Sequence, residues 1–174
     1  MSVHPSARIS PHARIYTNKL SVGKMSRIDD GVILTGDIEI GDYCHIAAYV
    51  VLTGSEGITI GDYSSISMYS NVLTGSDDFS GKSMMGPTIP DDYRPGLKKG
   101  AVILGRNVVV GAHSMIMPGV HLYDGCAIGA FSFVKETCDS NSIYAGVPAK
   151  FIKARHLDMW RFSHQLEDQN MVAA

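Results

Sequence analysis

Histidine is the residue in this sequence best suited to proton transfer near neutral pH. Seven histidines compete for that role, at positions 4, 12, 45, 113, 121, 156 and 164. A side chain of this kind can take the proton from a hydroxyl or an amine while that group attacks a carbonyl carbon. His45 is favoured because it lies between Cys44 and Ile46, which are both expected to point inward, so that it should point outward from an ordered wall.

That wall is predicted by a repeat of six residues. Aliphatic residues recur at Val22, Ile28, Leu34, Ile40, Ile46 and Leu52, at Ile60, Ile66 and Val72, and again at Leu104, Val110, Ile116, Leu122, Ile128 and Val134. Each fifth position is small or β-branched, with Ile38 as the large exception. A period of six fits neither a helix nor a simple alternating strand, but it fits a coil of short parallel strands, one block to each side.

Three blocks make one turn of such a coil, so residues 18 apart stack on the same side about 4.8 Å from each other. His45 should then lie in register with Arg27, Ser65 and Val109. Cys44 and Cys126 fall on inward fifth positions and are expected to be buried, whereas Cys138 lies beyond the repeats and is expected to be exposed.

The repeat is interrupted once on a large scale. Between Val72 and Leu104 about 26 residues must loop out, at about 74–100, and this segment is rich in Gly, Pro, Asp and Ser. Long loops in compact domains are usually functional, although a surface excursion without a task is the alternative. After the coil, which we place at 1–153, residues 154–174 should form a short helix with Leu157, Trp160, Phe162 and Leu166 on one face, and a tail.

The chain resembles the hexapeptide-repeat acyltransferases with a left-handed β-helix. The resemblance is carried by I-G-D at 40–42 and 60–62, P-G-V at 118–120 and A-G-V-P-A-K-F-I-K at 145–153. It implies an all-β fold, left-handed coiling, and a homotrimer in which the loop reaches over a neighbouring subunit. It also implies acetyl-coenzyme A-dependent transfer of an acetyl group to a hydroxyl or amine of a sugar, expected to be a nucleotide- or lipid-linked precursor of surface polysaccharide.

The resemblance also suggests site residues. The context G-D-Y-C-H-I around His45 is similar to the segment that carries the catalytic histidine in sugar N-acetyltransferases of this family. The maltose-type branch instead places its histidine early in the loop, where this chain has Asp77 and Asp78. These two aspartates and Asn71 are candidates for substrate binding. The aspartates could also orient a histidine from an adjacent subunit, and solvation of the loop is an equal alternative for them.

The coenzyme is expected to lie in a groove between late coils of the repeat, because small residues allow close approach. The residues assigned to it are Gly111, Ala112, Gly129, Ala130, Lys135, Pro148, Lys150 and Arg155. The basic members are placed there to meet phosphate groups. His113 and His121 are weaker candidates for the base and could line the same groove.

Composition and sequence pattern narrow the classes of function that remain possible. The net charge of −2 and the lack of a basic run give no sign of nucleic-acid binding. No apolar run is long enough to span a membrane and the N-terminus lacks a signal-peptide core, so a cytoplasmic location is expected. A metal-dependent carbonic anhydrase with this fold would need three converging histidines, and we expect no metal. A non-catalytic trimeric scaffold remains the alternative to an enzyme.

Overall fold

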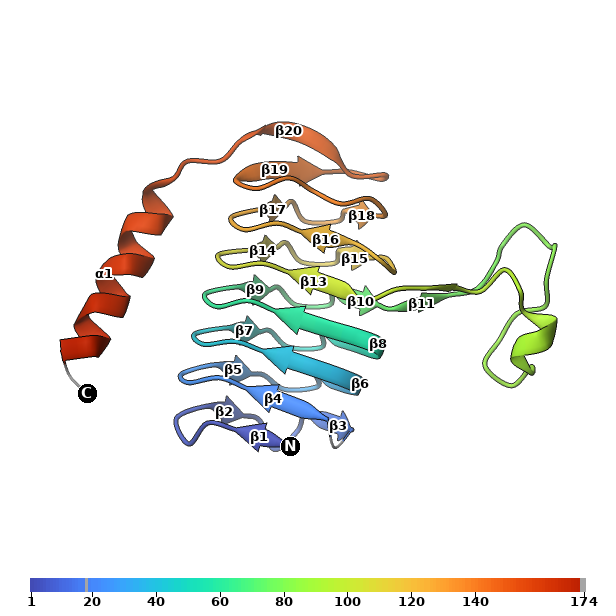
Figure 1. Cartoon of the computed structure of the whole chain (residues 1–174), viewed down its shortest axis with the longest axis horizontal. Coiled ribbons are helices and arrows are strands. Elements are labelled where there is room, and N and C mark those ends of the chain that lie inside the picture. Colours follow the sequence, from blue (N-terminus) through green and yellow to red (C-terminus); the bar gives the residue numbers. More distant parts are fainter. Residues whose placement is uncertain (18, 173–174) are drawn as a thin grey trace.

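The chain forms a coil of short parallel strands stacked along one axis, with a long loop projecting on one side and a helix on the other (Figure 1). The computed structural model describes residues 1–17 and 19–172. The predicted coil, interrupting loop and C-terminal helix are all present. The last two residues of the predicted tail lie outside the described residues.

The strands form three walls. Two walls belong to one sheet, made of β1 (Ser2–Val3), β3 (Arg14–Tyr16), β4 (Leu20–Val22), β6 (Ile33–Ile40), β8 (Val51–Ile60), β10 (Asn71–Leu73), β13 (Val102–Leu104), β15 (Met115–Ile116), β16 (His121–Leu122) and β18 (Phe133–Val134). The third, here called the His45 wall, contains β2 (Arg8–Ile9), β5 (Arg27–Ile28), β7 (His45–Ile46), β9 (Ser65–Ile66), β14 (Val109–Val110), β17 (Ala127–Ile128), β19 (Ser142–Ala145) and β20 (Lys150–Ala154).

The register is the one that the six-residue repeat predicts. His45 pairs with Arg27 on one side and with Ser65 on the other, and Ser65 pairs with Val109. One inward row runs through Ile9, Ile28, Ile46, Ile66, Val110 and Ile128. These rows form a continuous apolar core, so each coil is stabilised mainly by the coils directly above and below it.

Serine suits the inward fifth position because each coil leaves polar groups to be satisfied. The Ser26 hydroxyl donates to the carbonyl of Gly41 at 2.7 Å and accepts from the Cys44 amide at 2.8 Å. Ser64 does the same between Gly105 and Val108. A buried hydroxyl with both a donor and an acceptor partner links adjacent coils without leaving an unpaired group.

The cysteines follow the rows, with one correction. Cys44 and Cys126 are buried as predicted. Cys138 was expected to be exposed, but only 2% of its surface is accessible. It forms a parallel bridge with Leu122, so the inward row continues beyond the last regular block, with irregular spacing.

The fourth position of a block lies at a corner of the coil, and the backbone conformation there affects which residue types it takes. Most residues there adopt positive φ, with Asp37 and Ser55 among the exceptions. Four of them, Tyr49, Tyr69, His113 and Phe131, form what we call the aromatic corner. Their rings stack in sequence with centroids 5.1, 5.0 and 4.8 Å apart. Gly31 occupies the next position of this corner toward the N-terminus, where an added Cβ would lie 2.5 Å from the Tyr49 ring.

The loop leaves the coil as a short antiparallel ribbon, β11 (Gly75–Ser76) with β12 (Lys98–Lys99), and its tip holds the 3₁₀-helix η1 (Asp91–Tyr93). Arg94, with 12% of its side chain exposed, lies close to both Asp91 and Asp77. The tip therefore has internal structure, although it projects away from the strands (Figure 1).

Helix α1 (Asp158–Val172) lies along a corner of the coil other than the aromatic corner, on the side away from the loop (Figure 1). Trp160 Nε1 donates to the Asn141 side chain at 2.8 Å, and Ser163 is buried. The predicted apolar face was partly wrong, because Leu157 and Phe162 are 58% and 57% exposed. Within residues 1–17 and 19–172, no helix has the length and apolarity needed to cross a membrane.

Candidate functional site

His45 lies on the outer face of β7, between inward-facing Cys44 and Ile46, with 46% of its side chain exposed. Its Nε2 lies 2.8 Å from Oδ2 of Asp29, on the preceding coil. Arg27 Nε donates to Oδ1 of the same carboxylate at 2.5 Å. The rigid wall thus presents an imidazole that is held by a carboxylate, which is itself held by a guanidinium.

Two opposing effects act on Asp29. Partial burial acts to raise the pKa of its carboxyl, but hydrogen bonds from His45 and Arg27 outweigh burial, and the pKa lies below its ordinary value. Asp29 is therefore ionised at neutral pH. A neutral imidazole that donates its Nε2–H to this carboxylate keeps its lone pair on Nδ1, which is free to accept a proton from a substrate.

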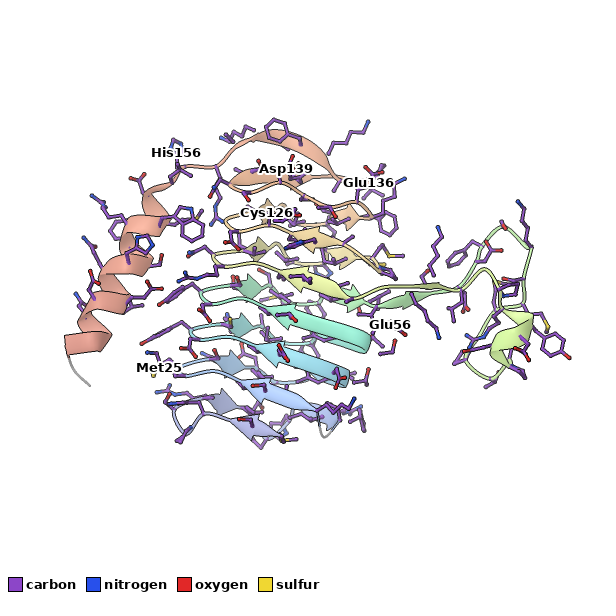
Figure 2. All side chains as sticks on the ribbon, in the orientation of Figure 1. Met25, Glu56, Cys126, Glu136, Asp139 and His156 are labelled. Atoms are coloured by element: carbon purple, nitrogen blue, oxygen red, sulfur yellow. The ribbon has the colours of Figure 1, made fainter. Side chains whose placement is uncertain are left out.

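The competing histidines are placed differently. The His113 ring is stacked between Tyr69 and Phe131 in the aromatic corner, and the His121 ring packs 3.9 Å from the ring of Tyr123. Figure 2 shows His156 on the link that precedes α1, away from the walls. In the described structure, none of the three forms a hydrogen bond or ion pair with a carboxylate, whereas His45 does.

A cavity of about 470 Å³ opens where the loop leaves the coil. It brings together three residues that the sequence assigned to binding, namely Asp77, Asp78 and Lys135. The rest of its lining is Ser76, Phe79, Ser80, Lys98, Met117, Pro118 and Phe133. Apolar rings and opposite charges meet here, as expected of a site for a polar molecule with an apolar part.

The two loop aspartates differ in their surroundings. Asp77 accepts a hydrogen bond from the Gly86 amide at 3.0 Å and lies 3.6 Å from Arg94 Nη1, so it organises the loop tip. Asp78 accepts hydrogen bonds from the amide and hydroxyl of Ser80, which lower the pKa of its carboxyl. Both aspartates are half-buried and both line the cavity. Asn71 lies on β10, two residues before the last strand residue that leads into the loop.

The small residues assigned to the coenzyme stack as predicted, and the structure adds a second reason for them. A Cβ on Gly111 would lie 2.4 Å from the Ala130 amide nitrogen, and one on Gly129 would lie 2.8 Å from the Ala145 Cβ. The Ala112 carbonyl accepts from the Phe131 amide at 2.9 Å. Close stacking of coils therefore requires glycine here, whether or not a ligand also approaches.

The late residues assigned to the coenzyme do not form one group. Lys135 lines the cavity at the loop base and lies 3.8 Å from Glu136, which Figure 2 labels beside the upper strands. Lys150 is exposed on β20, and Pro148 lies in the turn before it. Arg155 instead donates through Nη1 to the carbonyls of Asn107 and Gly125, at 2.8 and 3.1 Å.

Sequence reasoning missed Asp29 and the aromatic corner. Both left a signal. Arg27 and His45 were placed in register, which makes Asp29 a diagonal neighbour of His45 on the adjacent coil. The aromatic corner occupies the fourth position of four blocks, where a left-handed backbone turns the ring outward. His45 and the loop aspartates are not brought together within one chain, because β7 and the loop lie on opposite sides of the coil (Figure 1).

Two protein-family models match parts of the repeat region. Residues 20–54 match "Bacterial transferase hexapeptide (six repeats)", and residues 101–134 match "Hexapeptide repeat of succinyl-transferase".

Similar proteins cover most of the chain. A dTDP-4-amino-4,6-dideoxy-D-glucose acyltransferase of Escherichia coli is 37% identical over 88% of this chain and 82% of its own length. AntD, an N-acyltransferase from Bacillus cereus, superposes with a TM-score of 0.90 and 46% identity over 93% of this chain and 87% of its own, in a complex with dTDP and 3-hydroxybutyryl-CoA. A point mutant of AntD, in complex with dTDP-4-amino-4,6-dideoxyglucose and Coenzyme A, superposes with a TM-score of 0.90. It is 45% identical over 92% of this chain and 87% of its own.

Proposed function

This chain belongs to the hexapeptide-repeat acyltransferase family, and from that premise we propose that it acylates the amino group of a dTDP-linked 4-amino-4,6-dideoxysugar. The observation that carries the proposal is the similarity to the Escherichia coli protein described as a dTDP-4-amino-4,6-dideoxy-D-glucose acyltransferase. The similarity extends over 82% of that protein's length. The sequence left hydroxyl and amine acceptors open, and this likeness favours the amine.

The donor is a coenzyme A thioester. The sequence predicted acetyl-coenzyme A, but the similarity to AntD extends to a complex with 3-hydroxybutyryl-CoA, so a four-carbon acyl group is an equally good candidate. The cavity of about 470 Å³ at the loop base, with Phe79 and Phe133 in its lining, has room for a group larger than acetyl.

His45 serves as the general base. Its Nδ1 takes a proton from the acceptor nitrogen, which attacks the thioester carbonyl carbon and forms a tetrahedral intermediate. Collapse of this intermediate breaks the carbon–sulfur bond, and the protonated imidazole of His45 gives its proton to the sulfur, so that the coenzyme leaves as a thiol and the base is regenerated. Asp29 orients the imidazole and stabilises its protonated form, as the carboxylate of a catalytic triad does.

The site is completed by a second copy of the chain in a homotrimer. The loop, which projects away from its own coil, carries the cavity with Asp78 and Lys135 beside it, while His45 lies on the opposite side. Two elements that each resemble half of an active site are joined when the loop of one subunit reaches the His45 wall of the next.

The test measures thiol release from acetyl-CoA and from 3-hydroxybutyryl-CoA with dTDP-4-amino-4,6-dideoxyglucose as acceptor, followed by mass spectrometry of the sugar product. The control acceptor is dTDP-glucose, which carries a hydroxyl at the same carbon. The proposal requires an amide product and little release with the control. Release with the hydroxyl sugar alone would identify an O-acyltransferase instead.

A further inference from the structure

A second hollow lies at the N-terminal end of the coil, far along the axis from the late coils assigned to the coenzyme. It has a volume of about 670 Å³, within the range of small-molecule sites, and is lined by Pro11, His12, Ala13, Arg14, Asp30, Gly31, Ile33 and Tyr49. We call it the Arg14 hollow. The lining comes from three successive coils at the blue end of Figure 1.

The hollow has a cationic side. Arg14, on the outer face of β3, is exposed, and within the described residues its guanidinium pairs with no carboxylate. His12 lies beside it. Two other cations of the first coils are already paired with carboxylates, Lys19 with Asp37 and Arg27 with Asp29, whereas Arg14 is not, in the part of the chain that the structure describes. An arginine with unused donors is suited to bind a phosphate.

The hollow also has an aromatic side. Tyr49 is the last ring of the aromatic corner and is 52% exposed, and Gly31 leaves the next corner position without a side chain. The far face of the Tyr49 ring is fixed by stacking on Tyr69, with 4° between the ring planes. A rigid ring with open surface next to an arginine is the arrangement that holds a nucleobase and its phosphates.

The Arg14 hollow borders a smaller hollow that contains Asp29, the partner of the proposed base. This smaller hollow, of about 240 Å³, shares Pro11 and Asp30 with it and is also lined by Arg8, Ile9, Ser10, Arg27, Ile28 and Asp29. Asp29 is the partner of His45. A molecule that extends from the first hollow through the second therefore reaches the His45 wall beside the imidazole.

We propose that the Arg14 hollow binds the nucleoside diphosphate part of the acceptor, with the base against Tyr49 and the diphosphate against Arg14 and His12. Asp30, whose carboxylate already accepts from Ser10, offers an acceptor for a sugar hydroxyl. The sugar then lies in the smaller hollow, with its amine toward His45. This inference rests on the proposed function, because it assigns one part of the proposed acceptor to one place.

Coenzyme A also contains a nucleoside diphosphate, so the experiment separates the two sources. dTDP and coenzyme A are titrated separately into the intact protein by calorimetry, without turnover. The variants are Arg14→Gln and Tyr49→Asn, since asparagine tolerates the positive φ of 60° at this corner. Matched controls are Arg161→Gln on α1 and Met25→Asn, a corner residue with φ of 57° and the same 52% exposure, labelled in Figure 2.

We expect Arg14→Gln to weaken dTDP binding roughly ten- to hundredfold, and Tyr49→Asn by about fivefold or more, with coenzyme A binding unchanged and both controls equal to wild type. If wild type binds dTDP and both variants bind it equally well, the inference is wrong while the proposed function stands. If the variants lose coenzyme A binding instead, the hollow belongs to the donor and the inference is overturned. If wild type binds no dTDP, both proposals fail.

Discussion

His45 Nε2 lies 2.8 Å from Oδ2 of Asp29, so an imidazole and a carboxylate from successive coils form one pair on the outer face of the His45 wall. The pair exists because parallel stacking places residue Arg27 directly against His45, and Asp29 two residues further along. Arg27 completes it from the other oxygen of the carboxylate. The geometry engages Nε2 of His45 with Asp29 and leaves Nδ1 as the other ring nitrogen of the pair.

This pair predicts a pH-dependent contribution to stability. Because the pKa of Asp29 lies below its ordinary value of 3.8 in the folded chain, its ionised form stabilises the fold at neutral pH, and this contribution is lost as pH falls through the folded value. Asp29→Asn should therefore lower the free energy of unfolding at pH 7, and lower it by less at pH 3. Urea denaturation at both pH values measures the difference. The exposed Asp168→Asn is the control, and an Asp29→Asn effect that is the same at both pH values would contradict the account.

The core of the coil predicts a sharp contrast between two isoleucines. Ile46 is fully buried in the inward row, so Ile46→Asp places an unpaired charge among apolar side chains and should give insoluble protein. Ile103→Asp, on the outer face of β13 where the side chain is 40% exposed, should remain soluble. Expression and size-exclusion chromatography compare the two. A soluble, native-like Ile46→Asp protein would show that the register is wrong.

Substitution of Arg155 distinguishes a structural role of this residue from a role in binding the coenzyme. Its guanidinium donates to the carbonyls of Asn107 and Gly125, so Arg155→Met should lower the free energy of unfolding by about 1–3 kcal/mol. Coenzyme A affinity should change little. Lys153→Met, on the exposed strand β20, is the matched control and should be neutral. Weaker coenzyme binding with unchanged stability would restore the phosphate contact that the sequence predicted.

The proposed sharing of the site between subunits predicts complementation between inactive variants. His45→Ala lacks the base, and a second variant lacks the loop, with a short turn joining Ser76 to Lys98, which pair across β11 and β12. Each should be inactive alone, and co-expression should restore part of the thiol release, because mixed trimers can combine an intact loop with an intact His45.

The same experiment requires a trimer in sedimentation analysis of wild type. A stable monomer at micromolar concentration, or mixed assemblies without recovered activity, would contradict sharing of the site between copies.

The fold could be predicted because its signal is local and repeated. The inward rows, the register of His45 with Arg27, and the position of the loop all follow from where aliphatic residues recur. Cys138 was missed because the predicted repeat ends at Val134, although Cys138 follows the inward fifth position Ser132 by six residues. In the structure it pairs with Leu122, which lies 16 residues earlier instead of 18. The internal structure of the loop depends on contacts such as that between Asp77 and Arg94, which no repeat encodes.

The site was harder to predict for a physical reason. His45 could be recognised as an outward histidine on a rigid wall, but its partner is a diagonal neighbour on another coil, visible only when the register is drawn out. Tyr49 and Phe131 point outward because the backbone is left-handed at the fourth position of their blocks. This conformation could not be predicted from the residue types, because tyrosine and phenylalanine do not favour it.

The most direct test of the proposed mechanism is the turnover of His45→Ala with dTDP-4-amino-4,6-dideoxyglucose and the better acyl-CoA donor. Loss of the base should lower kcat by roughly 10²–10⁴ while the KM for acyl-CoA changes little, and Asp29→Asn should lower kcat less. His113→Ala and His121→Ala serve as comparisons and should each have a much smaller effect. A His45→Ala enzyme with near wild-type turnover, beside an inactive His113→Ala enzyme, would move the chemistry to the aromatic corner and contradict the assignment of His45 as the base.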